Sequence, residues 1–276
     1  MGFADASRPL RLAVAGLGAI GLEIARRVDA GRIEGMVLSA VAARDHGKAE
    51  RRMKDFVRPP ALLPLAELAR SADVVVECAP AAVFLEIARP ALERGLIFMP
   101  LSVGVLLDNM ELVEIARRTG GRIIVPSGAL LGLDAVRAVA QGTVHSVTMV
   151  TRKPPGALAG APHLERSALS LDGLTEPRLL FSGSAREAAR GFPANLNVAA
   201  ALALAGIGPD RTTVEIWADP AATRNTHTIE VKSDSSDFIM TIQNAPSAEN
   251  PRTGKITALS VLAALERLTA PLTVGA

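Results

Sequence analysis

The clearest candidate for chemistry is a glycine-rich turn near the start of the chain. Gly16, Gly18 and Gly21 form the pattern G-x-G-x-x-G, directly after strand-forming residues and directly before a helical pattern. The first glycine allows a tight turn, the second lets the backbone approach a pyrophosphate, and the third permits close packing of helix on strand. Backbone N–H groups at the helix start, including those of Ala19 and Ile20, then face the phosphates. The turn predicts a dinucleotide site; the alternative is a glycine turn that binds nothing.

The end of the second predicted strand bears on which dinucleotide is bound. A site specific for NAD would have an acidic residue there to hold the ribose hydroxyls. The chain has Ala43 at that place, followed by Arg44 and Asp45. The forked donors of Arg44 can pair with a 2′-phosphate, which favours NADP. In the alternative, Arg44 is solvent-exposed and Asp45 takes the acidic role, so the cofactor is predicted as NAD or NADP.

A histidine is the second candidate for chemistry. His227 begins an alternating strand pattern just after the segment ADPAATRNT, where loop and strand ends meet. An unperturbed imidazole, with a pKa of about 6.5, can exchange protons at neutral pH. The alternative is a strand-end histidine that only satisfies local hydrogen bonds. The other three histidines, His46, His145 and His163, are interpreted as structural or exposed.

The first half of the chain alternates between strand and helix patterns. Short, nearly continuous apolar runs predict strands at residues 10–16, 37–43, 73–79, 96–102 and 122–128. Helical patterns lie between them at residues 20–30, 62–70, 81–94 and 106–118. This alternation predicts an α/β fold, a doubly wound parallel sheet of the Rossmann type, over residues 1–125.

The second half has a different pattern, which predicts a second α+β domain over residues 126–250. Four segments alternate in polarity and predict a mostly antiparallel sheet with one solvated face: SVTMVTRK, TTVEIWAD, HTIEVKSD and DFIMTIQN. Helices are expected at residues 129–140 and 193–206, and Ser184 with Glu187 has the form of a capping box. Residues 251–276 contain a last helix, at 255–268, which we expect to pack back on the first domain.

Composition narrows the class of protein. The chain has 30 basic and 28 acidic residues, no tyrosine and 3% aromatic residues, so its basic pairs are interpreted as solvated faces and no nucleic-acid partner is expected. No apolar stretch reaches about 18 residues without a charge, so no membrane partner is expected either. Cys78 is the single cysteine, and no export signal is recognised. We therefore expect a cytoplasmic protein.

Nine segments spread over nearly the whole chain resemble the L-aspartate dehydrogenase family. They are AVAGLGAIG (13–21), ECAP (77–80), LSVG (101–104), PSGALLGLDA (126–135), TRKPP (151–155), FPANLNVAAALALAG (192–206), ADP (218–220), RNTHTIEV (224–231) and ENPRTGKITALSVLAAL (249–265). The first is common to many dehydrogenases, whereas the PSGA-GLDA, FPANLNVA and N-x-H-x-I segments together are far more specific.

The resemblance implies a reaction, an assembly and several site residues. The reaction is oxidation of L-aspartate through iminoaspartate to oxaloacetate and ammonia, or delivery of iminoaspartate to NAD biosynthesis, by a homodimer. His227 occupies the position of the family's catalytic histidine, and Ala129 and Asn197 match cofactor contacts. The chain departs from the family at Ala43, where many members have an acid, so a strict preference for NAD is in doubt.

Other polar residues could serve this chemistry. Arg152 and Lys153 are candidates to clamp the substrate carboxylates, with plain surface charge as the alternative. Asn195 and Asn197 either cap a helix or reach the ligand, and we assign Asn195 to the substrate. Asp219 either orients His227 or opens a turn.

The end of the third long strand is a further candidate for cofactor contacts. Cys78 and Ala79 lie where the adenosine side of a dinucleotide would pass, although the thiol itself is expected to be buried and inert. No Cys/His cluster has the spacing of metal ligands, so no metal is expected.

Three alternatives to this function remain open from the sequence. Two are enzymes of similar build, a homoserine dehydrogenase or a dihydrodipicolinate-type reductase. The third is a non-catalytic dinucleotide sensor, which the N-x-H segment disfavours because a sensor needs no proton-transfer group.

Overall fold

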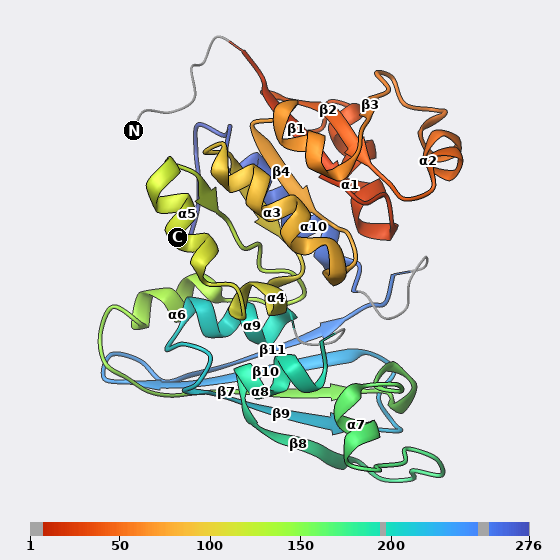
Figure 1. Ribbon diagram of the computed structural model, residues 1–276. Coiled ribbons are helices and arrows are strands. Elements are labelled where there is room, and N and C mark those ends of the chain that lie inside the picture. Colours follow the sequence, from red (N-terminus) through yellow and green to blue (C-terminus); the bar gives the residue numbers. More distant parts are fainter. Residues whose placement is uncertain (1–7, 194–196, 248–253, 276) are drawn as a thin grey trace. The chain divides into compact units, whose positions relative to one another are not determined.

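The computed structural model describes residues 8–193, 197–247 and 254–275 (Figure 1). These residues form two compact units. The first unit contains residues 8–126 and 258–273, and the second contains the described part of residues 127–257 together with residues 274 and 275. Within the described residues, no helix is long and apolar enough to cross a membrane.

The first unit is built on a six-stranded parallel sheet. Its strands are β1 (Leu10–Ala15), β2 (Met36–Ala42), β3 (Ala61–Leu62), β4 (Val74–Glu77), β5 (Ile97–Pro100) and β6 (Arg122–Ile123). Their order is β3-β2-β1-β4-β5-β6 and every pair is parallel. The order reverses between β1 and β4, and ligands of such sheets bind at the carboxyl ends of the strands beside that point. The predicted doubly wound sheet is confirmed.

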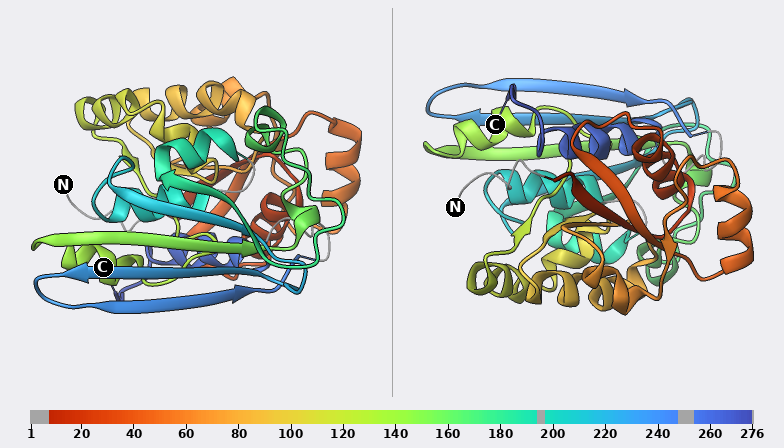
Figure 2. Two further views of the ribbon diagram at one scale, coloured as in Figure 1. Left: turned by 90° about the horizontal axis from the view of Figure 1, so that it is seen from below. Right: turned by 90° about the horizontal axis from the view of Figure 1, so that it is seen from above.

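Helices cover both faces of this sheet (Figure 2). They are α1 (Ala19–Asp29), α2 (His46–Met53), α3 (Phe84–Glu93), α4 (Val103–Leu107), α5 (Glu111–Thr119) and α10 (Ile256–Glu266), with short 3-10 helices η1 (Leu65–Arg70) and η2 (Ala81–Val83). The last helix, α10, contributes Val261, Leu262 and Leu265 to the core that α1 shares with β1 and β4. The chain therefore returns to the first unit at its end.

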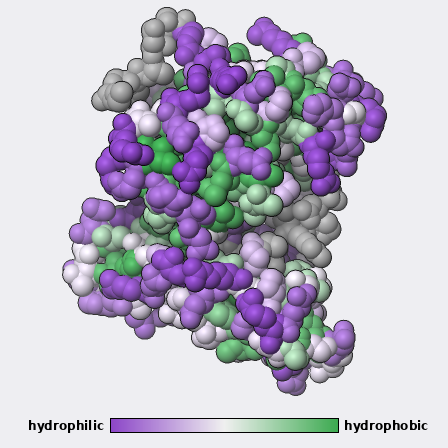
Figure 3. Space-filling model, viewed as in Figure 1, coloured by the Kyte–Doolittle hydropathy of each residue, from purple (hydrophilic) through white to green (hydrophobic). Residues whose placement is uncertain are grey.

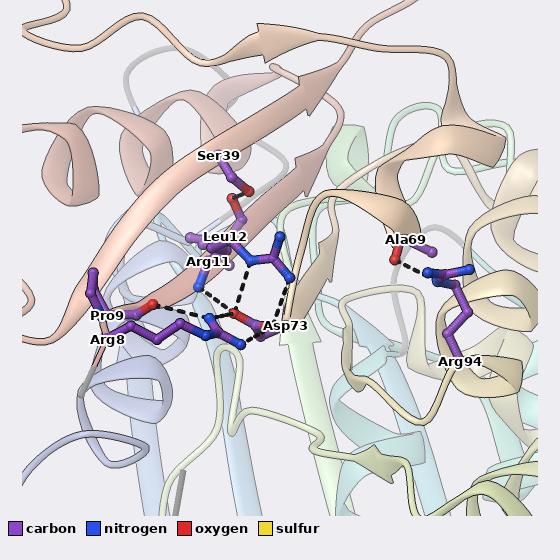
Figure 4. Close-up of polar contacts among 8 residues, drawn as sticks. All are labelled: Arg8, Pro9, Arg11, Leu12, Ser39, Ala69, Asp73 and Arg94. Atoms are coloured by element: carbon purple, nitrogen blue, oxygen red, sulfur yellow. Dashed lines mark hydrogen bonds and ion pairs between the residues drawn. The ribbon is translucent and has the colours of Figure 1, made fainter. Parts of the chain in front are cut away.

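Ion pairs join the amino ends of β1 and β4 (Figure 4). Asp73, just before β4, pairs with Arg8 at 2.7 Å and with Arg11 at 3.0 Å. Partial burial alone would raise the pKa of Asp73, but hydrogen bonds from the two arginines hold it well below its usual value. Nearby, Ser39 donates to the Leu12 carbonyl, which ties β2 to β1.

Three helices of the first unit differ from the sequence prediction. The helix expected at 62–70 is instead η1, which Pro64 precedes, and residues 61 and 62 belong to β3. The helix expected at 106–118 is two helices, because the Asn109 side chain donates to the Val105 carbonyl and competes with the helical pattern there. Helix α2 was not predicted, because only Ala49 and Met53 of its residues are buried. Hydrophilic side chains gather over it in Figure 3.

The second unit contains a five-stranded mixed sheet. Its strands are β7 (Val144–Lys153), β8 (Arg178–Ser184), β9 (Thr212–Ala218), β10 (Asn225–Ser233) and β11 (Phe238–Asn244), in the order β11-β10-β7-β9-β8. The β7–β9 pair is parallel and the other three pairs are antiparallel. The expected, mostly antiparallel sheet is confirmed, but β8 was not predicted.

Helices α6 (Leu133–Val139), α8 (Ala185–Gly191) and α9 (Asn197–Ala205) lie on one face of this sheet (Figure 1). A further helix, α7 (Pro162–Arg166), and the 3-10 helix η3 (Pro155–Ala157) follow β7. Helix α6 begins four residues later than expected, because Gly132 takes the left-handed conformation at φ 65° just before it. The capping box of Ser184 and Glu187 at the start of α8 is confirmed.

Candidate active site

The three glycines of the turn between β1 and α1 differ in what a side chain at each position would meet. Gly16 has φ +100°, and a Cβ there would lie 2.6 Å from the Cys78 carbonyl oxygen. A Cβ at Gly21 would collide with the Gly16 carbonyl oxygen, so only glycine lets α1 approach the turn so closely. At Gly18, by contrast, a Cβ would meet no atom within 4 Å. Gly18 therefore borders open space, whereas the other two glycines border backbone.

The start of α1 is suited to an anion. Its N-cap is Gly18, which offers no side chain to the helix amides, and the first turn contains no acidic residue. The first N–H groups of a helix, here those of Ala19, Ile20 and Gly21, have no partner within the helix and sit at its positive end. An open cradle at Gly18 in front of these groups fits the pyrophosphate of a dinucleotide.

At the end of β2, Arg44 and Asp45 are both exposed, but the Asp45 side chain also makes a structural contact. Asp45 is the N-cap of α2, and its Oδ1 accepts a hydrogen bond from the Lys48 N–H at 2.8 Å. One oxygen of the carboxylate therefore already serves the helix.

The segment after β4 lies directly against the glycine turn. The Cys78 carbonyl is the group that a side chain at Gly16 would strike, and the Cys78 N–H donates to the Ala15 carbonyl at 2.8 Å. Burial, together with the neighbouring Glu77 carboxylate, raises the pKa of the Cys78 thiol well above its usual value. The thiol is therefore neutral near pH 7, although Cys78 is half-buried rather than fully buried.

The polar groups of the second unit gather on the inner face at one end of its sheet. His227 on β10 is opposite Thr151 on β7, and Lys153 follows on the same face two residues later. Asn244, at the end of β11, shares this face. All four are at most 4% exposed, and most other inward residues of this face are apolar, with Thr212 on β9 as a further buried polar residue. Buried polar residues grouped in this way indicate a functional site.

His227 is neutral in this environment. Its Nδ1 lies 3.1 Å from the Thr151 hydroxyl oxygen. Burial, assisted by the charge of Lys153, lowers the pKa of His227 to about 3. This pKa lies well below that of an unperturbed imidazole, so the ring is unprotonated at pH 7 in the protein without substrate.

Lys153 and Arg152 are separated by the alternation of β7. Lys153 points inward, and burial lowers its pKa to about 8. Arg152 points to the other face, where its guanidinium stacks 4.7 Å from the centre of the Trp217 ring. Of the two cations suggested as a carboxylate clamp, only Lys153 belongs to the polar group.

Asn244 also fixes a turn that the sequence singled out. Its side-chain Nδ2 donates to the Ala129 carbonyl at 2.9 Å. Ala129 is half-buried in the turn before α6, and Asn197 is the first residue of α9. Asn195 lies outside the described residues.

The remaining polar candidates have structural roles. Asp219 accepts a hydrogen bond from the Ala221 N–H, which is the turn-opening role. His46 and His145 are exposed, and His163 lies 3.2 Å from the Leu180 carbonyl oxygen and packs against Phe192. Over the described parts of the chain, no group of three or more His, Cys, Asp or Glu residues could hold a metal ion.

Three buried polar residues near these sites were missed by the sequence analysis: Glu77, Thr151 and Asn244. The alternating pattern of β7 contained a signal for Thr151, because residues 147, 149, 151 and 153 share one face. Nothing comparable pointed to Asn244, whose role depends on a contact 115 residues away along the chain.

Comparison with known proteins extends these observations. The family model "Aspartate dehydrogenase, C-terminal" matches residues 134–268, and "Homoserine dehydrogenase, NAD binding domain" matches residues 16–126. The solved structure of an aspartate dehydrogenase from Thermotoga maritima is 22% identical with a TM-score of 0.71, covering 96% of this chain and 99% of that one. At this identity, that likeness concerns the fold.

Two relatives are much closer in sequence. An L-aspartate dehydrogenase of Bradyrhizobium diazoefficiens is 57% identical over 98% of this chain and 95% of its own length. The L-aspartate dehydrogenase 3 of Bordetella bronchiseptica is also 57% identical, over 96% of this chain and 97% of its own length. With agreement of this extent along both chains, and the glycine turn and the buried histidine in place, the protein belongs to the L-aspartate dehydrogenase family.

Proposed function

We propose that this protein catalyses the NAD(P)-dependent oxidation of L-aspartate, through iminoaspartate, to oxaloacetate and ammonia. The observation that supports this most is the buried group of His227, Lys153 and Thr151 on a mostly apolar sheet face. It offers one cation for a carboxylate and one neutral imidazole for a proton. Both are what a reaction of an amino dicarboxylic acid needs in addition to a dinucleotide.

In the proposed reaction, bound NAD(P)⁺ supplies the acceptor for the hydride that leaves Cα of aspartate. The first helical turn of α1 holds the pyrophosphate, with Gly18 leaving room for it. As the resemblance implies, Ala129 and Asn197 contribute further cofactor contacts. Cys78 and Ala79, beside the glycine turn, are proposed contacts by their position, and Asn195 is kept as the proposed substrate contact.

His227 then acts as the base. In the proposed tautomer Nδ1 carries the proton and donates to the Thr151 hydroxyl 3.1 Å away, which leaves the Nε2 lone pair for water. Water gives a proton to Nε2 while its oxygen adds to the carbon of the protonated imine, which forms a carbinolamine. The same proton then reaches the nitrogen, the C–N bond breaks to release ammonia, and the hydroxyl gives its proton to solvent as the C=O bond of oxaloacetate forms. Burial is the main cause of the low pKa of His227 and the charge of Lys153 is the second. A substrate carboxylate beside Lys153 would offset that second cause, so protonation of the ring becomes easier once aspartate is bound.

The test is a panel of amino acids with NAD and with NADP, followed as formation of the reduced cofactor. We expect turnover with L-aspartate and none with homoserine. Turnover with homoserine alone would indicate the related dehydrogenase. Tight binding of the cofactor without turnover of any amino acid would indicate a sensor.

We further propose that NADP is accepted at least as well as NAD. Ala43 leaves the acidic position empty, Arg44 is exposed, and Asp45 is engaged at the start of α2. Arg44→Ala should raise the KM for NADP about 10- to 150-fold, as expected for a lost charge-assisted contact of roughly 1.5–3 kcal/mol, and leave the KM for NAD nearly unchanged. Equal changes for both cofactors would assign Arg44 a general structural role.

Release of iminoaspartate, as a supply for NAD biosynthesis, is also part of the proposal. Sodium borodeuteride added during turnover reduces free imine to aspartate carrying deuterium at Cα. Its detection by mass spectrometry supports release, and its absence would show that hydrolysis is complete before the product leaves.

For the assembly and location, we propose a homodimer in the cytoplasm. Ile239 and Leu179 are exposed apolar residues on the two edge strands of the second sheet, and the single cysteine rules out a disulfide within the chain. Light scattering should give twice the 28.7 kDa mass of one chain; a monomer would contradict the assembly. Cell fractionation tests the location.

A further inference from the structure

Glu77 is a fully buried carboxylate that the proposed reaction does not use. It is the last residue of β4, at the carboxyl edge of the first sheet beside the point where the strand order reverses. Burying a carboxylate is costly unless hydrogen-bond donors surround it. We therefore expect hydrogen-bond donors around the Glu77 carboxylate.

Four donors surround this carboxylate, two on each oxygen. Oε1 accepts from the Ala79 N–H at 3.0 Å and from the Ser102 hydroxyl at 3.0 Å. Oε2 accepts from the Leu101 N–H at 3.2 Å and the Ser102 N–H at 2.9 Å. Burial raises the pKa of Glu77, and these hydrogen bonds counteract part of the rise. The carboxylate thereby links the segment after β4 to the segment after β5.

The segment after β5 and the segment after β4 differ in the hydrogen bonds that they make besides those to the Glu77 carboxylate. The Leu101 N–H also donates to the Glu77 main-chain carbonyl at 3.1 Å, within the continuing β4–β5 ladder. For the Ala79 N–H, the Glu77 side chain is the acceptor that the described structure provides. Ala79 follows Cys78, whose carbonyl is the contact that forbids a side chain at Gly16. The Cys78 N–H bond to the Ala15 carbonyl also holds this segment, so Glu77 supplies a second main-chain contact to the segment that packs against the glycine turn.

We propose that Glu77 is a positioning residue for the dinucleotide, which acts through the Ala79 amide to hold the Cys78–Ala79 segment against the glycine turn. This inference rests on the proposed placement of the cofactor at Gly18. It assigns a task to Glu77 that involves no contact with the cofactor or with the reacting atoms.

The isosteric variant Glu77→Gln tests the amide contact with little change in volume. The amide oxygen can take the place of Oε2 and keep the Leu101 and Ser102 N–H groups. The amide NH₂ then replaces Oε1, where the Ser102 hydroxyl can turn and accept from it. The Ala79 N–H, however, faces a second donor and loses its bond. The variant therefore releases Ala79 and keeps the β5 side in place.

Two matched controls separate this effect from general destabilisation. Ser102→Ala removes one bond to the same Oε1 but leaves the Ala79 bond intact. Asp73→Asn makes the same carboxylate-to-amide change at the opposite end of β4, where it weakens the ion pairs with Arg8 and Arg11. Both should lower the melting temperature without changing cofactor affinity.

The measurement is the dissociation constant of NADH and NADPH, by fluorescence titration, alongside thermal denaturation. For Glu77→Gln we expect a rise of about tenfold for both cofactors, the equivalent of one lost hydrogen bond. In the two controls the constant should stay within about twofold of the wild type. The KM for aspartate, measured at saturating cofactor, should be unchanged in all three.

An unchanged dissociation constant for a folded Glu77→Gln variant overturns the inference, and so does an equal loss in Ser102→Ala or Asp73→Asn. If Glu77→Gln does not fold, Glu77→Asp replaces it, because the shorter carboxylate keeps its charge but cannot reach all four donors. The same outcomes then apply. Failure of the cofactor placement itself is a separate result, in which Gly18→Val leaves the affinity unchanged.

Discussion

Burial determines the charge states of the two titratable residues at the end of the second sheet. Lys153 and His227 are both nearly inaccessible to solvent, so the protonated form of each is disfavoured. With a pKa of about 8, Lys153 is still mostly charged at pH 7, whereas His227, at about 3, is neutral. This combination suits a cation that binds an anionic group and a base that accepts a proton.

Lys153 should therefore control the affinity for aspartate in a pH-dependent way. Its pKa is lowered, so the charge is present below about pH 8 and is lost as the pH rises through that value. The KM for aspartate should rise above about pH 8. Lys153→Met should raise it about 10- to 150-fold at pH 7 and remove this dependence, since a charged hydrogen bond of roughly 1.5–3 kcal/mol is lost.

Arg152→Met is the matched control for Lys153. It removes a cation from the neighbouring position on β7, whose side chain lies on the opposite face against Trp217. The KM for aspartate should be unchanged in this variant. A similar rise in both variants would mean that general charge, and not the inward position of Lys153, governs the affinity.

At the scale of elements, the turn between β1 and α1 contains a position, Gly18, where a substitution should weaken cofactor binding without destabilising the fold. Because a Cβ at Gly18 would meet no atom within 4 Å, Gly18→Val should leave the melting temperature nearly unchanged. The branched side chain would occupy the cradle of the pyrophosphate, so the dissociation constant for NAD(P)H should rise at least about tenfold. Gly18→Ala should give a smaller rise.

Fluorescence titration and thermal denaturation of the same preparations check this expectation. Retained affinity in a folded Gly18→Val protein would move the pyrophosphate away from α1. A large loss of stability would mean instead that the space beside Gly18 is needed by the chain itself.

The elements predicted correctly are those whose own residues form a strong hydrophobic or alternating pattern. The strands β1, β2, β4, β7, β9, β10 and β11 have strong hydrophobic runs or strict alternation, and the glycine turn has its own spacing. Helix α2 and strand β8 were missed because few of their residues are buried, so they have weak periodicity. The split between α4 and α5 depends on one side chain, that of Asn109, which competes with the backbone.

Site residues divide in the same way. The glycines could be singled out from their motif and spacing alone, and His227 from the segment that resembles the family, without knowledge of the fold. Thr151, Asn244 and Glu77 act through contacts with residues on other strands or loops, and only the register of the sheets brings those partners together. The lowered pKa of His227 was not predicted, because burial and the neighbouring Lys153 cannot be inferred from the sequence of a single strand.

At the scale of the whole molecule, the residues proposed for cofactor binding and those proposed for proton transfer belong to different units. The first unit contains the dinucleotide cradle, and the second contains the histidine and the lysine. Family models match both halves, with "Homoserine dehydrogenase, NAD binding domain" on the first and "Aspartate dehydrogenase, C-terminal" on the second. The second half is therefore the part that the aspartate dehydrogenase model describes.

The most direct test of this assignment is the kcat of His227→Ala for oxidation of L-aspartate at saturating substrate and cofactor. We predict a fall of about 10²–10⁴-fold, the usual contribution of a positioned acid/base group. The dissociation constant for NAD(P)H should change little, because the first unit holds the phosphates. A folded His227→Ala protein that retains most of its kcat would contradict the account and direct the search for the base to Lys153.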